Sequence, residues 1–183
     1  MVLPARTGLG NGAVSKEEGD VVSYEERVEE MGLEIPDYSV TPYYGPSYGS
    51  MKAHHQVGSL LFLSGHVPEY PDGTILHPGH LGAEVTIEQG YEAARLAAIN
   101  CLAGIRYALG SLDRVKAIVR SLNFVACTPD FTDVHKVSSG ATDLLRDVFG
   151  DEAGVGGRAT IGVTSLARNH CFENWLTVEV EPG

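Results

Sequence analysis

The segment from Thr86 to Gly110 constrains the fold most, because its apolar residues recur with the period of an α-helix. Thr86 and Gln89 form a capping box at its start, and Gly110 is a typical C-terminal stop signal. One stripe of this helix carries Ile87, Tyr91, Ala94, Ala98, Cys101, Leu102, Ile105 and Leu109. Small residues on and next to the stripe (Ala93, Ala94, Ala97 and Ala98) allow the helix to lie close to a sheet. The segment therefore predicts a long helix packed on strands.

A strand and a second long helix follow. The run VKAIVRSLNFVAC is rich in β-branched residues and predicts a strand over Val115–Ala126. Asp130 or Thr132 is placed to cap a helix that ends before Gly150. The predicted inner face of this helix carries Val134, Val137, Ala141, Leu144, Leu145 and Val148.

The first residues predict little regular structure. Residues 1–22 are rich in glycine and have no hydrophobic period, so we interpret them as a flexible tail. Ser23 and Glu26 form a second capping box, which predicts a short helix that Gly32 and Pro36 end.

Two short strands are predicted on either side of Gly58, over Lys52–Val57 and Leu60–Ser64. The segment EYPDGTIL contains a Pro-Asp-Gly turn, and whether a third strand forms next to it is left undecided by the sequence. We therefore divide the chain into the tail, a short helix with an irregular connection over residues 23–46, and one folded domain over residues 47–183.

The chain ends in two alternating segments within GGRATIGVTSLARNHCFENWLTVEV. Each predicted strand has one charged residue near its start, Arg158 in the first and Glu173 in the second. The order of elements predicts an α+β fold, in which a single mixed β-sheet carries two long helices on one face.

Charge and cysteine content exclude several classes of protein. The net charge is −11 and no cluster of lysine and arginine occurs, which argues against a nucleic-acid partner. No apolar run reaches the ~18 residues of a membrane helix, and the N-terminal segment lacks the apolar region of a secretory signal. Three cysteines in dissimilar settings suggest no disulfide framework, so we expect a cytoplasmic protein.

Several separated blocks of the sequence resemble the RidA family, also called YjgF/YER057c/UK114. These blocks are VGSLLFLSGHVPEYPDGT, EQGYEAARLAAINCLAGI, LDRVKAIVRSLNFVACTPDFTD and GRATIGVTSLARNHCFENWLTVEV, and the resemblance runs from about Ser47 to Val180. It implies a chorismate-mutase-like α+β fold of the bacillus type, assembled as a homotrimer with active clefts between subunits. It also implies hydrolysis of reactive enamines and imines with release of ammonia.

The resemblance assigns roles to individual residues. Arg158 matches the arginine that grips the substrate carboxylate, and Glu173 matches the glutamate that handles the attacking water. Ser64 and Gly65 match the serine and glycine that line the cleft. Tyr48 is the best match for a tyrosine of the cleft, although two other tyrosines, Tyr43 and Tyr44, compete with it.

Three positions depart from the family pattern and leave the substrate open. Gly157 replaces the proline that usually precedes the arginine. Thr160 stands where some members have cysteine, and His135 stands where many have asparagine. We count His135 and Thr160 among the expected substrate-binding residues.

The residue types themselves fit this chemistry. The guanidinium of Arg158 offers a rigid fork of donors that matches a carboxylate with two parallel hydrogen bonds. A glutamate beside apolar surface, such as Glu173 next to Trp175, is suited to proton transfer in the hydrolysis of an imine. A solvated arginine and a cross-strand ion pair are the structural alternatives for these two residues.

Spacing suggests how the two charges are used. If the last two strands form a hairpin that turns near Ala167–Asn169, Glu173 lies opposite Thr164 or Ser165. It is then ~20 Å from Arg158, at ~3.3 Å per strand residue. We therefore expect the two residues to belong to one composite site between subunits.

Two other groups of residues are weaker candidates for chemistry. Five histidines (His54, His55, His66, His77 and His80) lack a supporting carboxylate at ligand spacing, so we expect no metal site. Cys127 has no evident histidine to activate it as a nucleophile. No phosphate-binding glycine motif occurs, so we expect no cofactor.

The leading hypothesis is thus a cofactor-free deaminase that acts on a small carboxylated enamine or imine. A pathway-specific deaminase of the 2-aminomuconate type uses the same cleft for one substrate and is the nearest alternative. An endoribonuclease and a non-catalytic trimer that binds small ligands are alternatives of other classes. Fold resemblance alone does not identify the substrate.

Overall fold

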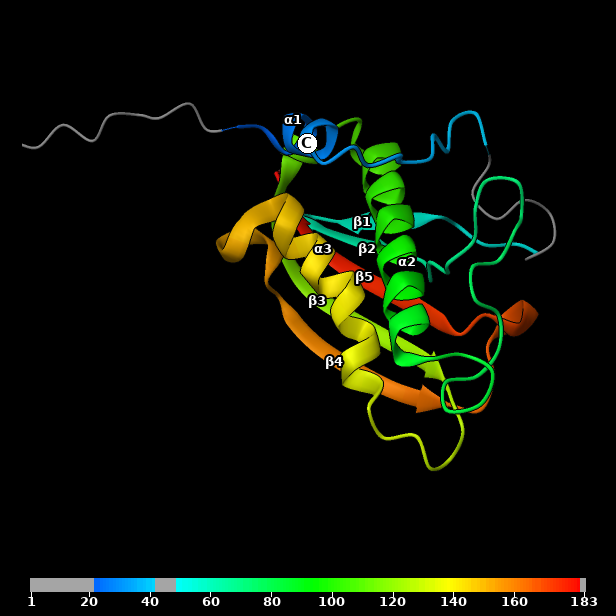
Figure 1. The fold of residues 1–183 in the computed structure, drawn as a ribbon. Helices are drawn as coiled ribbons and strands as arrows, with labels where there is room; N and C mark the ends of the chain where they lie inside the picture. Colours follow the sequence, from blue (N-terminus) through cyan, green and yellow to red (C-terminus); the bar gives the residue numbers. More distant parts are fainter. Residues whose placement is uncertain (1–21, 42–48, 182–183) are drawn as a thin grey trace, which may run out of the picture.

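The computed structural model describes residues 22–41 and 49–181. Within this part of the chain one mixed sheet has the strand order β1-β2-β5-β3-β4, and α2 and α3 lie side by side across one of its faces (Figure 1). The predicted α+β architecture is confirmed. The strands are β1 (His54–Val57), β2 (Leu60–Leu63), β3 (Val115–Ala126), β4 (Gly157–Val163) and β5 (Phe172–Val180). The helices are α1 (Tyr24–Glu30), α2 (Ile87–Leu109) and α3 (Val134–Gly154), with short 3-10 turns η2 (Leu112–Arg114) and η3 (Ala167–Asn169).

The helix α2 begins and ends as predicted. Thr86 and Gln89 form the capping box, and Gly110 takes the left-handed conformation that ends the helix. The four alanines Ala93, Ala94, Ala97 and Ala98 are buried in the core, where α2 packs against the sheet and α3. The two helices approach so closely that a side chain at Gly140 of α3 would collide with the backbone carbonyl of Tyr91. No helix of the described residues is both long and apolar enough to cross a membrane.

The helix α3 differs from the prediction at both ends. Its N-cap is Asp133, which makes no side-chain capping bond, rather than Asp130 or Thr132. Gly150 does not lie past the end of the helix but interrupts it, with φ of 80° and ψ of 173°. The helix resumes because apolar side chains continue to face the core on both sides of the break, at Phe149 and Ala153.

The last two strands do not form a hairpin, so that prediction is wrong. β4 pairs in parallel with β3, and β5 pairs antiparallel with the other edge of β3. The chain returns from β3 through α3 to β4, a crossover connection that makes neighbouring strands parallel. β5 then takes the central position between β2 and β3. The EYPDGTIL turn forms only an isolated bridge between Glu69 and Ile75.

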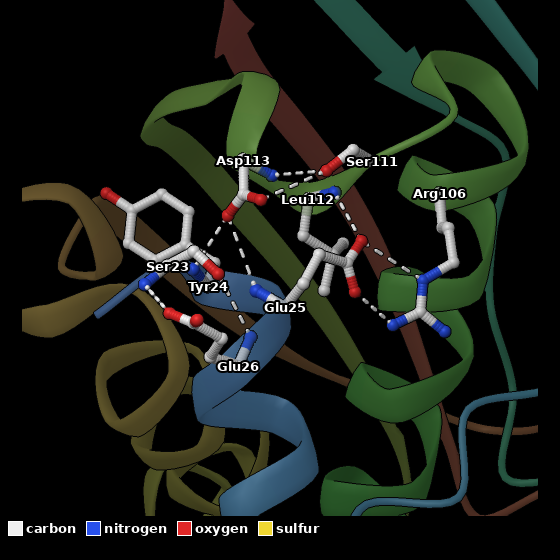
Figure 2. A network of polar contacts seen from close by, with 8 residues as sticks. All are labelled: Ser23, Tyr24, Glu25, Glu26, Arg106, Ser111, Leu112 and Asp113. Carbon is white, nitrogen blue, oxygen red and sulfur yellow. Dashed lines mark hydrogen bonds and ion pairs between the residues drawn. The ribbon is translucent and has the colours of Figure 1, made fainter. Parts of the chain in front are cut away.

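Two carboxylates fix the helix α1 to the rest of the fold (Figure 2): one from η2 caps the start of α1, and one from α1 caps the start of η2. Asp113 of η2 accepts the backbone N–H of Tyr24 at 2.7 Å, and Glu25 of α1 accepts the backbone N–H of Leu112 at 2.8 Å. Glu25 also binds Arg106 of α2 through Nη2 at 2.5 Å. The predicted capping box of Ser23 and Glu26 is present. These contacts attach α1 firmly at the sequence boundary where the predicted tail ends.

Candidate active site

One pocket lies where β2 ends and β5 begins, and it encloses about 490 Å³. We call it the Glu173 pocket. It brings together Ser64, Gly65 and Glu173, three residues that the sequence had assigned to one cleft. Its complete lining is Met51, Leu63, Ser64, Gly65, Val67, Ala167, Glu173 and Trp175.

Backbone pairing places these residues side by side. His66 and Asn174 exchange two backbone hydrogen bonds of 2.8 Å, and this antiparallel pairing sets Gly65 opposite Trp175, where the side chain of Glu173 also reaches it. Along β5 the side chains alternate, so that Phe172 and Asn174 are buried beneath the helices while Glu173 faces the other side of the sheet. Ser64 closes the end of the β1–β2 pair, since its N–H donates to the carbonyl of Ala53 at 2.9 Å and its hydroxyl to that of Lys52 at 2.5 Å.

The carboxylate of Glu173 is held in one position. The indole N–H of Trp175 donates to Oε1 of Glu173 at 2.6 Å. The backbone of Gly65 approaches the pair so closely that an added Cβ would overlap Oε1 and lie 2.7 Å from the indole nitrogen. Among the described residues none donates a hydrogen bond to Oε2. One carboxylate oxygen is therefore fixed, and the other is available to a water molecule or substrate.

The loop before β5 supports the rim of this pocket. Nη1 of Arg168 lies 2.6 Å from each carboxylate oxygen of Glu69, and Nε2 of His170 lies 3.2 Å from the same group. Burial lowers the pKa of His170, although Glu69 opposes the effect. Arg168 and Asn169 both adopt positive φ, at 52° and 63°, a strained conformation for residues with side chains. This anchoring fixes the turn that carries Ala167 into the pocket.

A second group of predicted residues gathers at β4 and the start of α3. Nη1 of Arg158 donates to Oγ1 of Thr142 at 3.0 Å and to Oγ of Ser139 at 3.4 Å. Thr160 shares a 2.7 Å hydrogen bond with Ser138. His135 is exposed one turn before these serines. Two turns of α3 thus hold the side chains of Arg158 and Thr160, which point from the same side of β4, through hydrogen bonds.

A cavity of about 200 Å³ adjoins Arg158. Its walls come from α3, the segment before β4, and the middle of β3. They consist of Ile118, Ser121, Thr142, Asp143, Leu145, Arg146, Gly154, Val155, Gly156 and Arg158. The guanidinium therefore stands at the edge of a small hollow rather than in bulk solvent alone.

Arg158 and Glu173 of one chain lie on opposite faces of the sheet. Arg158 aligns with Ser121 of β3, and Glu173 aligns with Phe124. Side chains three residues apart on a strand point to opposite faces. Two strand spacings and three residues separate their Cα atoms by about 14 Å, in place of the ~20 Å expected for a hairpin. A small molecule cannot contact both groups within a single chain.

The other sequence candidates fall elsewhere. Tyr48, Tyr43 and Tyr44 lie outside the described residues. Cys127 is partly buried, and burial raises the pKa of its thiol, which disfavours the nucleophilic thiolate.

The histidines do not form one cluster. His77 pairs with Glu92 at 2.9 Å, and Nε2 of His80 lies 3.0 Å from the carbonyl of Thr164. Burial lowers the pKa of His66 to about 4. Within residues 22–41 and 49–181 no three His, Cys, Asp or Glu side chains are grouped as metal ligands.

Sequence reasoning missed three contributors to these sites. The alternation of β5 placed Trp175 on the side of Glu173, but nothing in the pattern predicted the hydrogen bond between them. Ser139 and Thr142 occupy the helix turn opposite Arg158. Their role depends on the register between α3 and β4, which has no sequence signal.

Comparison with known proteins gives consistent matches. A family model described as "YjgF/chorismate mutase-like, putative endoribonuclease" matches residues 25–175. Protein TCP17 of Trypanosoma cruzi is 40% identical over 123 residues, which cover 67% of this chain and 76% of that protein.

Two crystal structures are similar over 86% of this chain. The protein Atu1372 of Agrobacterium tumefaciens, described as having unknown function, has a TM-score of 0.75 and 31% identity over 94% of its length. A protein of Shewanella oneidensis that carries the same endoribonuclease description as the family model has a TM-score of 0.78 and 33% identity over 99% of its length.

Proposed function

The chain belongs to the YjgF/chorismate-mutase-like family, and from that premise we propose that it is a cofactor-free hydrolytic deaminase of small carboxylated enamines and imines. The observation that carries the proposal is the carboxylate of Glu173, fixed by Trp175 and Gly65 in a largely apolar pocket. We place the protein in the cytoplasm, a reducing compartment that suits the three free thiols of Cys101, Cys127 and Cys171.

Glu173 acts as the general base and then as the general acid. The imine reacts in its protonated form. Glu173 takes a proton from water as the water oxygen bonds to the iminium carbon, and the π electrons of the C=N bond move to nitrogen to give a neutral carbinolamine. Glu173 then donates that proton to the nitrogen. The C–N bond breaks with its electron pair going to nitrogen, while the hydroxyl oxygen forms C=O and returns its proton to the Glu173 carboxylate, so one water is consumed and one ammonia is released. An enamine enters this sequence after tautomerising to the imine.

Arg158 binds the substrate carboxylate. Since Thr142 and Ser139 both engage Nη1, Nη2 and Nε of the guanidinium remain available for two parallel hydrogen bonds. Because Arg158 and Glu173 of one chain face opposite sides of the sheet, each site takes them from different subunits.

The open face of the sheet supports assembly as a homotrimer. It exposes Phe62 by 42%, Ile161 by 46% and Trp175 by 48%, with Leu122 and Phe124 half-buried between them. Several large apolar side chains exposed on one face are typical of a subunit interface. Sedimentation is expected to give a trimer, and a dilute monomer that retains activity would contradict the composite site.

A 2-aminomuconate-type deaminase is the nearest alternative, since it uses the same groups for one pathway substrate. The endoribonuclease description of the family model and of the Shewanella relative gives a different reaction. The net charge of −11 opposes the approach of an RNA backbone. A trimer that only binds small carboxylates needs Arg158 but not the proton transfer of Glu173.

The test measures ammonia release from a panel of amino-acid imines generated in situ, with the spontaneous rate subtracted. Glu173→Gln keeps the size of the side chain but cannot accept a proton, so kcat is expected to fall by roughly 10²–10⁴. Arg158→Lys keeps the charge but loses the fork, so KM is expected to rise. Normal turnover by correctly assembled Glu173→Gln would disprove the role of the carboxylate, and RNA cleavage without imine hydrolysis would favour the alternative reaction.

A further inference from the structure

Trp175 occupies an unusual position for a large aromatic residue. It is the only tryptophan of the sequence, and almost half of its surface is exposed, at 48%. It lines the Glu173 pocket beside the carboxylate that the proposed reaction uses. Large apolar side chains that remain exposed beside a pocket commonly contact a ligand or a partner.

The indole is fixed at two points. Its N–H donates to Oε1 of Glu173 at 2.6 Å, and its ring meets that of Phe124 edge to face, with centroids 5.3 Å apart and an interplanar angle of 64°. The backbone of Gly65 lies directly against both the indole nitrogen and the carboxylate. The ring plane is therefore set before any substrate arrives.

The rest of the pocket is apolar and roomy. Met51, Leu63, Val67 and Ala167 supply carbon surface, while Ser64 and Glu173 supply the polar groups. A volume of about 490 Å³ lies within the range of sites that bind ligands the size of a drug molecule. The imine of a three-carbon amino acid would leave much of this apolar space to water.

We propose that Trp175 makes the site selective for imines and enamines that carry a large planar substituent, an aromatic ring or a conjugated chain. The substituent stacks on the indole while the C=N carbon stands next to Glu173. This inference rests on the deaminase function proposed above, and it adds the class of substrate. Trp175 is then a substrate-binding residue through its ring and a positioning residue for Glu173 through its N–H.

The two roles can be separated by substitution. Trp175→Phe keeps a ring but removes the N–H, so kcat should fall roughly ten-fold for all substrates, while the preference for aromatic imines persists. Trp175→Leu removes both, so the preference should also disappear. Phe62→Leu is the matched control, because Phe62 is exposed on the same face but does not line the pocket. Sedimentation verifies that each variant assembles as the parent does.

The kinetic experiment compares the imines of phenylalanine and alanine, each generated in situ by an amino-acid oxidase. We expect kcat/KM to favour the phenylalanine imine by roughly ten-fold or more, and expect this ratio to be lost in Trp175→Leu but retained in Phe62→Leu. Equal kcat/KM for both imines, or an unchanged ratio in Trp175→Leu, would overturn the proposed selectivity while leaving the deaminase function intact.

A binding experiment does not depend on turnover. Because the chain has a single tryptophan, its fluorescence reports directly on Trp175. Titration with 3-phenylpropionate should quench this emission at a concentration roughly ten-fold below that needed for propionate. Quenching with this preference but without hydrolysis of any imine would refute the deaminase function and support an aromatic-carboxylate site. Equal or absent quenching by both probes would refute the stacking role.

Discussion

Gly65→Ala tests whether the position of the Glu173 carboxylate, rather than its mere presence, determines activity. The added methyl would overlap Oε1 of Glu173 and lie 2.8 Å from its Cδ and 2.7 Å from Nε1 of Trp175. Carbon contacts are optimal at about 3.5–4.0 Å, so the carboxylate has to move by roughly 1 Å. Gly65 does not adopt a left-handed backbone conformation, so alanine brings no backbone strain of its own.

The side chain of Glu173 gives way more easily than the fold does. It is only partly buried, and the hydrogen bond from Trp175 that holds its carboxylate is less costly to lose than the backbone pairing of the sheet. The free energy of unfolding should therefore fall by about 1 kcal/mol or less, which is the lower end of the cost of overpacking a core. In a chain of this size such a loss lowers Tm by ~2–4 °C. A displacement of 1 Å at a reacting group can reduce kcat by about 10². We expect a nearly normal stability and a hundred-fold slower enzyme.

The assay pairs steady-state ammonia release with thermal unfolding. Gly157→Ala is the stability control, because its added methyl makes only an ordinary 3.5 Å contact with the carbonyl of Val119 in another strand. If Gly65→Ala turned over at the parental rate, the carboxylate would not need the position seen here. If it lost several kcal/mol of stability, the close approach would be a structural requirement of the fold.

Three further predictions concern the rest of the chain. A truncation that begins at Ser23 removes the predicted tail but keeps the contacts of α1, so turnover and trimer stability should be unchanged; a large loss of either would assign the tail a structural role. Burial raises the pKa of Glu25, but hydrogen bonds from Arg106 and the Leu112 N–H lower it by more, to below its ordinary value. The ionised carboxylate therefore stabilises the fold above its unfolded pKa, and this contribution is lost as pH falls through the lower folded pKa. In urea unfolding, Glu25→Gln should have a free energy of unfolding about 1 kcal/mol below that of the parent at pH 7, and this difference should disappear in acid. A difference that does not depend on pH would contradict the reasoning. Exhaustive chelation should leave turnover intact, and a loss restored by one metal would refute the cofactor-free mechanism.

The sequence by itself determined the elements and the chemistry of their side chains. The helix α2, its capping box and the limits of β3 follow from local periodicity and end signals, which act over a few residues and need no tertiary information. The blocks around Ser64 and Arg158 identified the family, and the alternation of β5 separated Glu173 from its buried neighbours. The break at Gly150 showed the limit of such signals, because buried residues beyond it carry the helix onward.

Only the tertiary structure decided which strands are neighbours. A strand pattern states which side chains share a face, but its pairing depends on the crossover through α3, which placed β3 between β4 and β5. That arrangement put Arg158 and Glu173 on opposite faces, and it brought Gly65 against the pair formed by Glu173 and Trp175. Contacts between residues more than a hundred positions apart depend on the packing of the whole domain, so the geometry of the site exists only in the folded chain.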